Sequence, residues 1–301
     1  MQGLTPCFLF NMKVSGFTFI RNARRFDYPI VEAIQSILPL CDEVVVAVGD
    51  SEDDTLSIIQ GIQSPKIRII HTHWDDTLRA GGQVLAIETN KALAAIASDT
   101  DWALYIQGDE VLHEQYIPVI RDAMTMHLSD QRVDGLLMHY HHFYGSYDYI
   151  GSPLQWYPFE IRIFKPNRGI YSYKDAQGFR KAENQKLNVY KIPAWVYHYG
   201  WVKDPQAMQD KQLHFNKYWH DDEWVERNVV PGDTFDYGNV RFLERFTGTH
   251  PQYMQARIVS RNWSFDFDIS VNRLTVKEKC KKFLLQHMGW DTGHKNYRVL
   301  K

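Results

Sequence analysis

Two adjacent acids, Asp109 and Glu110, follow a short apolar run from Trp102 to Ile106 that is typical of a buried strand. In an open α/β sheet, ligands bind just beyond the carboxyl ends of the strands. A carboxylate placed there can hold a hard divalent cation, which usually brings a phosphate with it. The same two acids would also suit the start of a helix, because acids there complement the helix dipole. The residues that follow the other predicted strands decide between a cation site and the start of a helix.

Polar side chains also follow the first two predicted strands. Arg21 and Asn22 come after the first strand, and Asp50 and Asp53 lie in the acidic segment after the second. A bound nucleotide diphosphate needs acceptors for its base and ribose, and it needs a cation or basic side chains for its phosphates. Since the carboxyl ends of parallel strands meet at one edge of a sheet, these residues predict a nucleotide-diphosphate site there.

The elements that must position these residues alternate along the first half of the chain. Strands are predicted over 14–20, 44–48, 67–71 and 102–106, with helices over 28–38, about 55–61 and 81–98 between them. This order predicts an α/β fold with a doubly wound, mostly parallel sheet. Beyond it we expect a helix over 114–128, strands over 133–144, 159–165 and 192–199, and helices over 205–218, 221–227 and 274–287. The aromatic segment 147–158 is typical of a binding loop.

Composition and charge exclude several classes of protein. The chain has 301 residues and a formal net charge of -2, so no global basic field favours nucleic acid. Three widely separated cysteines argue against a disulfide framework and favour a reducing compartment. No apolar stretch is long enough to span a bilayer. We therefore expect a cytoplasmic protein in which residues 1–11 are a disordered extension.

Five segments occur in an order and spacing that point to a family: VSGFTFIRNARRF, CDEVVVAVGDSEDDT, TNKALAAIASDTDWALYIQGDEVL, FEIRIFKPNRG and VYHYGW. Together they resemble the motifs of family-2-like glycosyltransferases with the GT-A fold, over roughly residues 12–205. The resemblance implies a nucleotide-sugar half over 12–130, an acceptor half over 131–205, and a helical C-terminal region over 206–301. It implies transfer of a hexose from a nucleotide-diphosphate sugar to a glycan, a lipid-linked glycan or another hydroxyl acceptor. The usual setting of that family is polysaccharide biosynthesis, with which peripheral membrane association is compatible.

The resemblance also implies roles for individual residues. Asp109 would bind a divalent cation, Mg²⁺ or Mn²⁺, and His198 stands where related enzymes place a late metal or phosphate contact. The residues expected to bind the donor are Arg21, Asn22, Asp50, Asp53, Asn90, Gln107 and Arg162. Gln107 takes the place of the first acid in the family's Asp-x-Asp triplet, and an amide offers one neutral oxygen where a carboxylate offers charge.

An inverting transfer needs a general base that takes the proton from the acceptor hydroxyl. Asp175, which follows the predicted strand 159–165 and a turn, is the first candidate and Glu160 the second. Glu110 would support the same centre. A turn-forming surface acid is the alternative interpretation of Asp175. Arg162 lies inside an apolar strand and therefore needs a partner.

The histidines of strand 133–144 do not predict a metal site. Alternation along a strand sends His139 and His141 to one face and His142 to the other. Stacking or polar roles beside the acceptor groove are expected instead. Trp156 and Tyr157 suit stacking on a sugar face and core packing equally well.

Two other classes of protein remain open. One is a catalytically inactive GT-A-like protein that binds nucleotides or glycans, which Gln107 makes plausible. The other is a nucleotidyltransferase, although the segment RNARR after the first strand lacks the glycines that such enzymes normally carry there. Donor hydrolysis in the presence of Mn²⁺ separates an enzyme from a binding protein.

Overall fold

The computed structural model describes residues 12–152, 155–229, 232, 234–272, 274–288 and 295–300. The extension predicted over residues 1–11 lies outside them. Within the described residues no helix is both long and apolar enough to cross a membrane.

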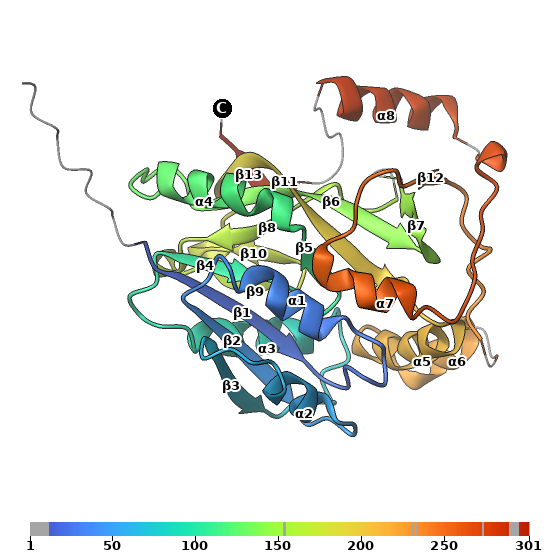
Figure 1. The fold of residues 1–301 in the computed structure, drawn as a ribbon, viewed down its shortest axis with the longest axis horizontal. Coiled ribbons are helices and arrows are strands. Elements are labelled where there is room, and N and C mark those ends of the chain that lie inside the picture. The colour runs from blue at the N-terminus through green and yellow to red at the C-terminus, as the bar shows by residue number, and fades with distance from the viewer. Residues whose placement is uncertain are drawn as a thin grey trace, which may run out of the picture.

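A parallel four-stranded unit forms the first half of the main sheet (Figure 1). Its strands are β1 (Val14–Ile20), β2 (Glu43–Gly49), β3 (Ile67–Thr72) and β4 (Trp102–Tyr105), in the spatial order β3-β2-β1-β4. Every pairing in this unit is parallel, so the carboxyl ends of its strands share one edge. The doubly wound α/β fold predicted from the sequence is confirmed.

Helices cover both faces of this unit because its strands are apolar on both sides. The connecting helices are α1 (Ile30–Ile37), α2 (Thr55–Gln60) and α3 (Gln83–Ala94). Val44 and Val46 pack on the face that also buries Ile34 of α1, whereas Val45 packs with Val84 of α3. Burial of this kind stabilises a fold by about 25 cal/mol per Å² of apolar surface.

The second half of the sheet is mixed. Strand β8 (Phe159–Phe164) lies antiparallel to β4, and β6 (Gly135–Tyr144) lies antiparallel to β8. The long strand β11 (Leu187–Trp201) then runs parallel to β6. The helix α4 (Ile117–Met126), the 3₁₀ turn η1 (Glu114–Tyr116) before it and the small ribbon of β9 (Tyr171–Tyr173) and β10 (Gly178–Arg180) complete this half.

Two predicted local structures are wrong. The acids after β4 do not begin a helix, since Glu110–Leu112 is a short strand, β5, that pairs with β11. The segment 147–158 is not wholly a loop, because Ser146–Gly151 forms strand β7 against β6. In both places the pairing partner lies far away in sequence or the strand is short, so local periodicity does not reveal it.

The C-terminal region contains the three expected helices, α5 (Pro205–Phe215), α6 (Asp222–Asn228) and α8 (Val276–Met288), and a short helix that was not predicted, α7 (Gln255–Val259). Short 3₁₀ turns accompany them, including η4 (Asn216–Tyr218) after α5. It is not only helical, because β12 (Leu243–Arg245) pairs with β7 and β13 (Tyr297–Val299) pairs with β11. The region is therefore tied into the main sheet.

Candidate functional site

A cavity of about 280 Å³ opens where β1 and β4 end. The loops after these strands form its floor, and α5 with the following 3₁₀ turn forms its opposite wall. The lining groups used below are Arg21, Trp74, Gln107, Asp109, His142, Trp156, Tyr157, Asp175, Gln177, His198, Trp201, Lys211, Tyr218 and Trp219. Arg21 and Asp109 line the same cavity. This placement is consistent with the sequence prediction that the strand ends converge on one site.

Asp109 carries the negative charge at the centre of this cavity. Burial by itself would raise its pKa, but neighbouring charges, of which Lys211 has the largest effect, lower it to about 2. The carboxylate is therefore ionised at neutral pH. Its main chain is fixed by β11, because the Tyr199 amide donates a 2.8 Å hydrogen bond to the Asp109 carbonyl.

A chain of histidines fixes which ring nitrogen faces Asp109. His142 Nε2 lies 2.8 Å from the carbonyl oxygen of Tyr157, which can only accept, so this nitrogen donates. Burial lowers the pKa of both His142 and His198, which keeps the rings neutral. His142 Nδ1 must then accept the 3.1 Å hydrogen bond from His198 Nδ1. His198 Nε2 is left with a lone pair, 3.7 Å from Asp109 Oδ2.

The side-chain atoms at this point could coordinate a divalent cation that a bound ligand also coordinates. Asp109 Oδ2 and His198 Nε2 are both acceptors and face the same gap. Gly200 keeps the gap open, since a Cβ there would lie 2.6 Å from His198 Nε2 and 2.7 Å from Asp109 Oδ2. Within the described residues no cluster of three or more His, Cys, Asp or Glu side chains converges on one point. A cation held here would take its remaining ligands from phosphate oxygens or water.

Lys211 brings a second positive group to the same carboxylate. Its Nζ lies 3.3 Å from Asp109 Oδ2 and donates a 3.0 Å hydrogen bond to the Gly200 carbonyl. The ammonium is held over the Tyr28 ring, 5.0 Å from the ring centroid. Lys203 lies behind it, fully buried, and burial with the neighbouring charge of Lys211 lowers its pKa to about 7.

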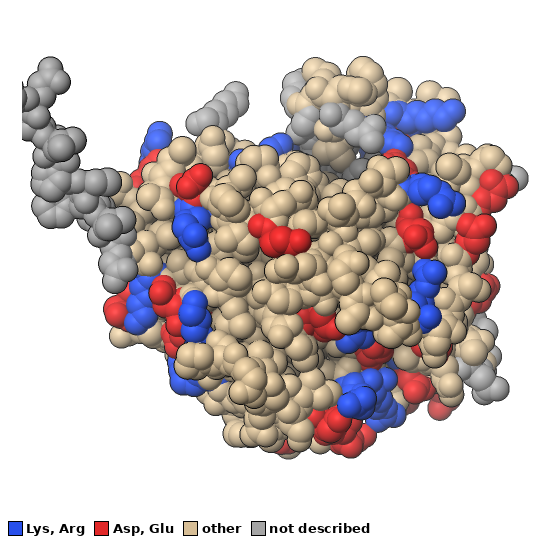
Figure 2. All heavy atoms as spheres, in the orientation of Figure 1, with Lys and Arg blue, Asp and Glu red and all other residues tan. Residues whose placement is uncertain are grey.

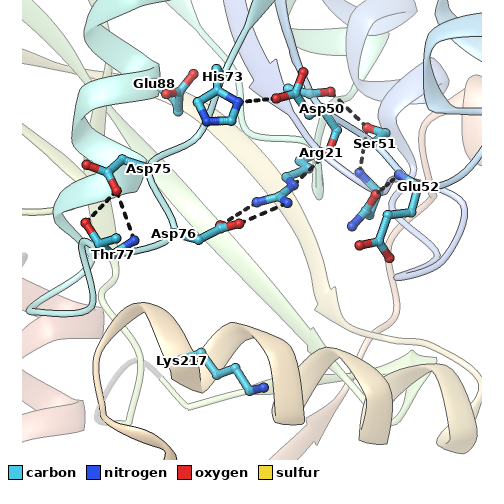
Figure 3. Close-up of polar contacts among 12 residues, drawn as sticks. Arg21, Asp50, Ser51, Glu52, His73, Asp75, Asp76, Thr77, Glu88 and Lys217 are labelled. Atoms are coloured by element: carbon cyan, nitrogen blue, oxygen red, sulfur yellow. Dashed lines mark hydrogen bonds and ion pairs between the residues drawn. The ribbon is translucent and has the colours of Figure 1, made fainter.

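Arg21 links the cavity to the loops after β2 and β3. Its Nε donates a 2.9 Å hydrogen bond to the Asp50 carbonyl, and its Nη1 pairs with Asp76 at 2.6 Å (Figure 3). The guanidinium lies over the Trp74 ring, 5.7 Å from the centroid. Arg21 also lines a second, more polar cavity of about 310 Å³, which it shares with Asn22 and with Lys217 across the opening (Figure 3).

Asp175 and Gln107 also line the cavity. Burial raises the pKa of Asp175, although its Oδ1 accepts a 2.9 Å hydrogen bond from the Gln177 amide. The Gln107 side-chain nitrogen donates to the Ala176 carbonyl at 3.0 Å. Both residues line the cavity, as expected of a base candidate and a donor contact, and their roles remain predictions.

Other predicted site residues hold the framework instead of facing the cavity. Glu110 and Arg162 form a buried pair with N–O distances of 2.7 and 2.9 Å, so Arg162 has the partner that the sequence required and neither group is free to meet a substrate. Glu160 is buried behind Gln177, which donates to it at 2.7 Å, and burial raises its pKa to about 7. This geometry fits the supporting role expected of Glu110, and the donor contact expected of Arg162 stays a prediction.

Three further residues that were predicted to bind the nucleotide-sugar donor instead connect separate segments of the chain. The Asp53 carboxylate accepts from the amides of Arg25 and Thr55, and it therefore joins the loops after β1 and β2. Asn90 exchanges two hydrogen bonds with the Ser172 main chain, which fixes β9 against α3. Asp50 is exposed and pairs with His73 (Figure 3). None of the three lines either cavity.

Asp76 and Trp74 are site residues to which the sequence assigns no role. Lys211 is a candidate phosphate contact from its sequence, but its helix follows the recognisable motifs and a solvated basic residue is the alternative interpretation. Trp74 and Asp76 lie in the segment HWDDT, which connects β3 to α3. An aromatic residue beside two acids directly after a strand was the sequence signal that could have identified them.

No family model matches the chain, and no curated protein matches it in sequence. It is similar in structure to S. aureus TarS, with 17% identity and a TM-score of 0.40 over 67% of this chain and 38% of TarS. It is also similar to 4-diphosphocytidyl-2C-methyl-D-erythritol synthase from Anaerococcus prevotii, with 12% identity and a TM-score of 0.38 over 64% of this chain and 92% of that one.

A third similar structure is glucosyl-3-phosphoglycerate synthase from Mycobacterium tuberculosis, crystallised with Mn²⁺, UDP and phosphoglyceric acid. It has 22% identity and a TM-score of 0.29 over 44% of each chain. The ligands named for these proteins are theirs, and the chemistry of this chain rests on its own residues.

Proposed function

We propose that the chain is a glycosyltransferase that moves a sugar from a nucleotide-diphosphate donor to a hydroxyl acceptor. The observation that carries this proposal is the meeting of Asp109, the lone pair of His198 Nε2 and the Lys211 ammonium in one cavity at the ends of β1 and β4. Asp109 and His198 together form a negatively charged pair of possible metal ligands beside the fixed ammonium of Lys211. Such a site suits a diphosphate that binds together with a divalent cation.

The donor's nucleoside belongs, in this proposal, at the end of the cavity nearest β3. Trp74 packs with Phe19 and Tyr218 there, with ring centroids 5.7 Å apart in both pairs, and offers an aromatic wall for a base. Arg21 and the Asp76 carboxylate supply a donor and an acceptor for the base edge or the ribose hydroxyls. Gln107 and Asp109 then face the phosphates and the sugar.

The phosphates would lie between Asp109, His198 and Lys211. Asp109 and His198 would hold a divalent cation, Mg²⁺ or Mn²⁺, which would neutralise charge on the leaving diphosphate. Lys211 stands 3.3 Å from the same carboxylate and is placed to donate to a phosphate oxygen. Because a lysine shares the site, part of the stabilisation of the leaving group comes from the protein itself.

The acceptor would enter from the side of Trp156, Tyr157 and Trp201, whose rings line the cavity and suit the apolar face of a sugar. Asp175 takes the proton from the acceptor hydroxyl. The hydroxyl oxygen forms the bond to the anomeric carbon while the bond from that carbon to the diphosphate breaks. Attack from the face opposite the diphosphate inverts the anomeric centre. Glu160 is the second candidate for the base, but it acts from behind Gln177.

The first experiment is a thermal-shift panel of uridine-, guanosine- and thymidine-diphosphate sugars with and without Mn²⁺, followed by donor-turnover assays on the sugar that stabilises the protein. We expect one nucleotide class to raise Tm and Asp109→Asn to abolish turnover while the fold stays intact. Asp122→Asn, at an exposed position of α4, is the matched control. No shift with any donor, or full turnover by Asp109→Asn, would overturn the proposal.

One observation favours a catalytically inactive nucleotide- or glycan-binding protein as the second candidate. Gln107 replaces an acid and donates its amide hydrogen to the Ala176 carbonyl, so it adds no negative charge for a cation. If a donor binds but neither hydrolysis nor transfer follows in the presence of Mn²⁺, the binding function is the correct one.

A further inference from the structure

Exposed apolar side chains are concentrated near the C-terminus. Eleven large apolar side chains are exposed in the described part of the chain, and five of them lie within the twenty residues 269–288. They are Ile269, Val271, Val276, Phe283 and Met288, with exposed fractions from 47% to 79%. Isolated exposed apolar residues are ordinary, but a local concentration marks an interaction surface.

Helix α8 is built as an ordered element that presents one face outward. Thr275 and Glu278 cap its first turn reciprocally, because the Thr275 amide donates to Glu278 Oε2 at 2.8 Å and the Glu278 amide donates to Thr275 Oγ1 at 3.3 Å. Glu278 also pairs with Arg241 at 3.1 Å, and Lys282 pairs with Glu244. These contacts hold the inner face of α8 against the segment that contains β12.

The outer face of α8 combines an apolar stripe with lysines. Val276, Cys280 and Phe283 follow each other at spacings of four and three residues, so they form one stripe on the side opposite Lys282. Lys277 flanks one side of that stripe and Lys279 flanks the other, while Lys281 lies further round the helix beside Lys277. None of these three lysines forms an ion pair with another described residue.

We propose that α8, with the preceding turn η6 (Ile269–Val271), is a docking surface for an anionic lipid bilayer. The apolar stripe would enter the headgroup region while the flanking lysines reach lipid phosphates. Charge complementarity supports this occupant, since the lysines lie beside the stripe and have no acidic partner among the described residues. Figure 2 shows basic side chains at one end of this helix with uncharged surface beside them.

The local charge matters because the whole chain is slightly acidic, with a net charge of -2. The overall charge of the protein would therefore not attract it to an anionic vesicle, so binding would have to come from a local surface. The inference does not depend on the proposed transferase activity, since vesicle binding is measured without donor or acceptor.

The test is flotation of the full chain with vesicles of phosphatidylcholine alone or with about one third phosphatidylglycerol. We expect binding only to the anionic vesicles, and weaker binding as salt rises. Lys277→Glu/Lys279→Glu/Lys281→Glu should lower the partition coefficient at least about tenfold, and Val276→Asp/Phe283→Asp should do the same. Met126→Asp, at an apolar position on α4 that is 70% exposed, should leave it unchanged.

Three results would overturn the proposal. The first is no flotation of the full chain with anionic vesicles. The second is binding that survives both α8 variants when circular dichroism and Tm show that they fold normally. The third is a dimer in solution that Phe283→Asp converts to a monomer while vesicle binding is absent, which would assign the face to a second copy of the chain.

Discussion

Lys211 Nζ lies 3.3 Å from Asp109 Oδ2, across the cavity between α5 and the end of β4. The two residues are 102 positions apart in sequence. Their contact brings helix α5 against the end of β4, so the lining of the cavity is not complete in residues 12–205 alone. A fixed ammonium at this place affects both the carboxylate and any phosphate bound beside it.

Replacement of Lys211 by methionine should weaken binding of a nucleoside diphosphate without added metal by at least about tenfold, because one charge-assisted hydrogen bond is lost. Lys211→Arg should restore part of the affinity, since the charge is kept. Titration calorimetry with UDP, GDP and dTDP measures both effects. Lys186→Met, at an exposed lysine that donates to the Lys295 carbonyl, is the control. Equal affinities in Lys211→Met and the unaltered chain would contradict the phosphate role.

Buried strands could be predicted from the sequence, whereas contacts between residues far apart in the sequence could not. Strands β1, β2 and β3 lie within one residue of their predicted bounds, because buried parallel strands are apolar runs that punctuation residues end. Asp109 could be singled out because it follows such a run. The partner of Arg162 could not be identified, since Glu110 reaches it only through the pairing of β5 and β8 with distant strands.

The Glu110–Arg162 pair should matter for stability more than for chemistry. Both side chains are fully buried, and Tyr140 donates a further 2.8 Å hydrogen bond to Glu110. Glu110→Gln or Arg162→Met should lower the free energy of unfolding by about 3–5 kcal/mol, because each leaves a buried charge without its partner. That loss corresponds to a fall in Tm on the order of 10 °C.

A double-mutant cycle measured by thermal denaturation checks this assignment. Glu110→Gln/Arg162→Met should be more stable than the sum of the single losses predicts, since no unpaired charge remains. Additive effects would show that the pair is not coupled. A Glu110→Gln protein of unchanged Tm and lost turnover would instead return Glu110 to the chemistry.

Three half-buried histidines should make the fold sensitive to acid. Burial lowers the pKa of His139, His141 and His250 from the ordinary 6.5 to about 4. Between these values the unfolded chain binds more protons than the folded chain, so stability falls as pH falls from 6.5 to about 4. His139 and His141 both stack on Trp195, which confirms that alternation places them on one face of β6.

Differential scanning calorimetry across this pH range measures the effect. His141→Phe should flatten the dependence, because one group that titrates differently in the two states is removed. A Tm that stays constant from pH 6.5 to 4 in the unaltered chain would show that these histidines are not held neutral by burial.

Asp175 should determine the acid limb of the pH–rate profile. A general base must be ionised, and burial raises the pKa of Asp175 above its ordinary 3.8, so kcat/KM should fall with decreasing pH at a higher pH than for an exposed aspartate. Asp109 does not produce this limb, because its pKa is lowered to about 2. Asp175→Asn should reduce kcat about 100-fold or more while the KM for the donor changes little.

The control is Gln177→Ala, which removes the side chain beside Asp175 without touching its carboxylate and should retain the acid limb. If Asp175→Asn keeps kcat and Glu160→Gln loses it, the second candidate is the base. Glu160 would produce a limb near pH 7, because burial raises its pKa to about 7. The position of the limb therefore separates the two carboxylates before any variant is made, and the two single variants show which of them takes the acceptor's proton.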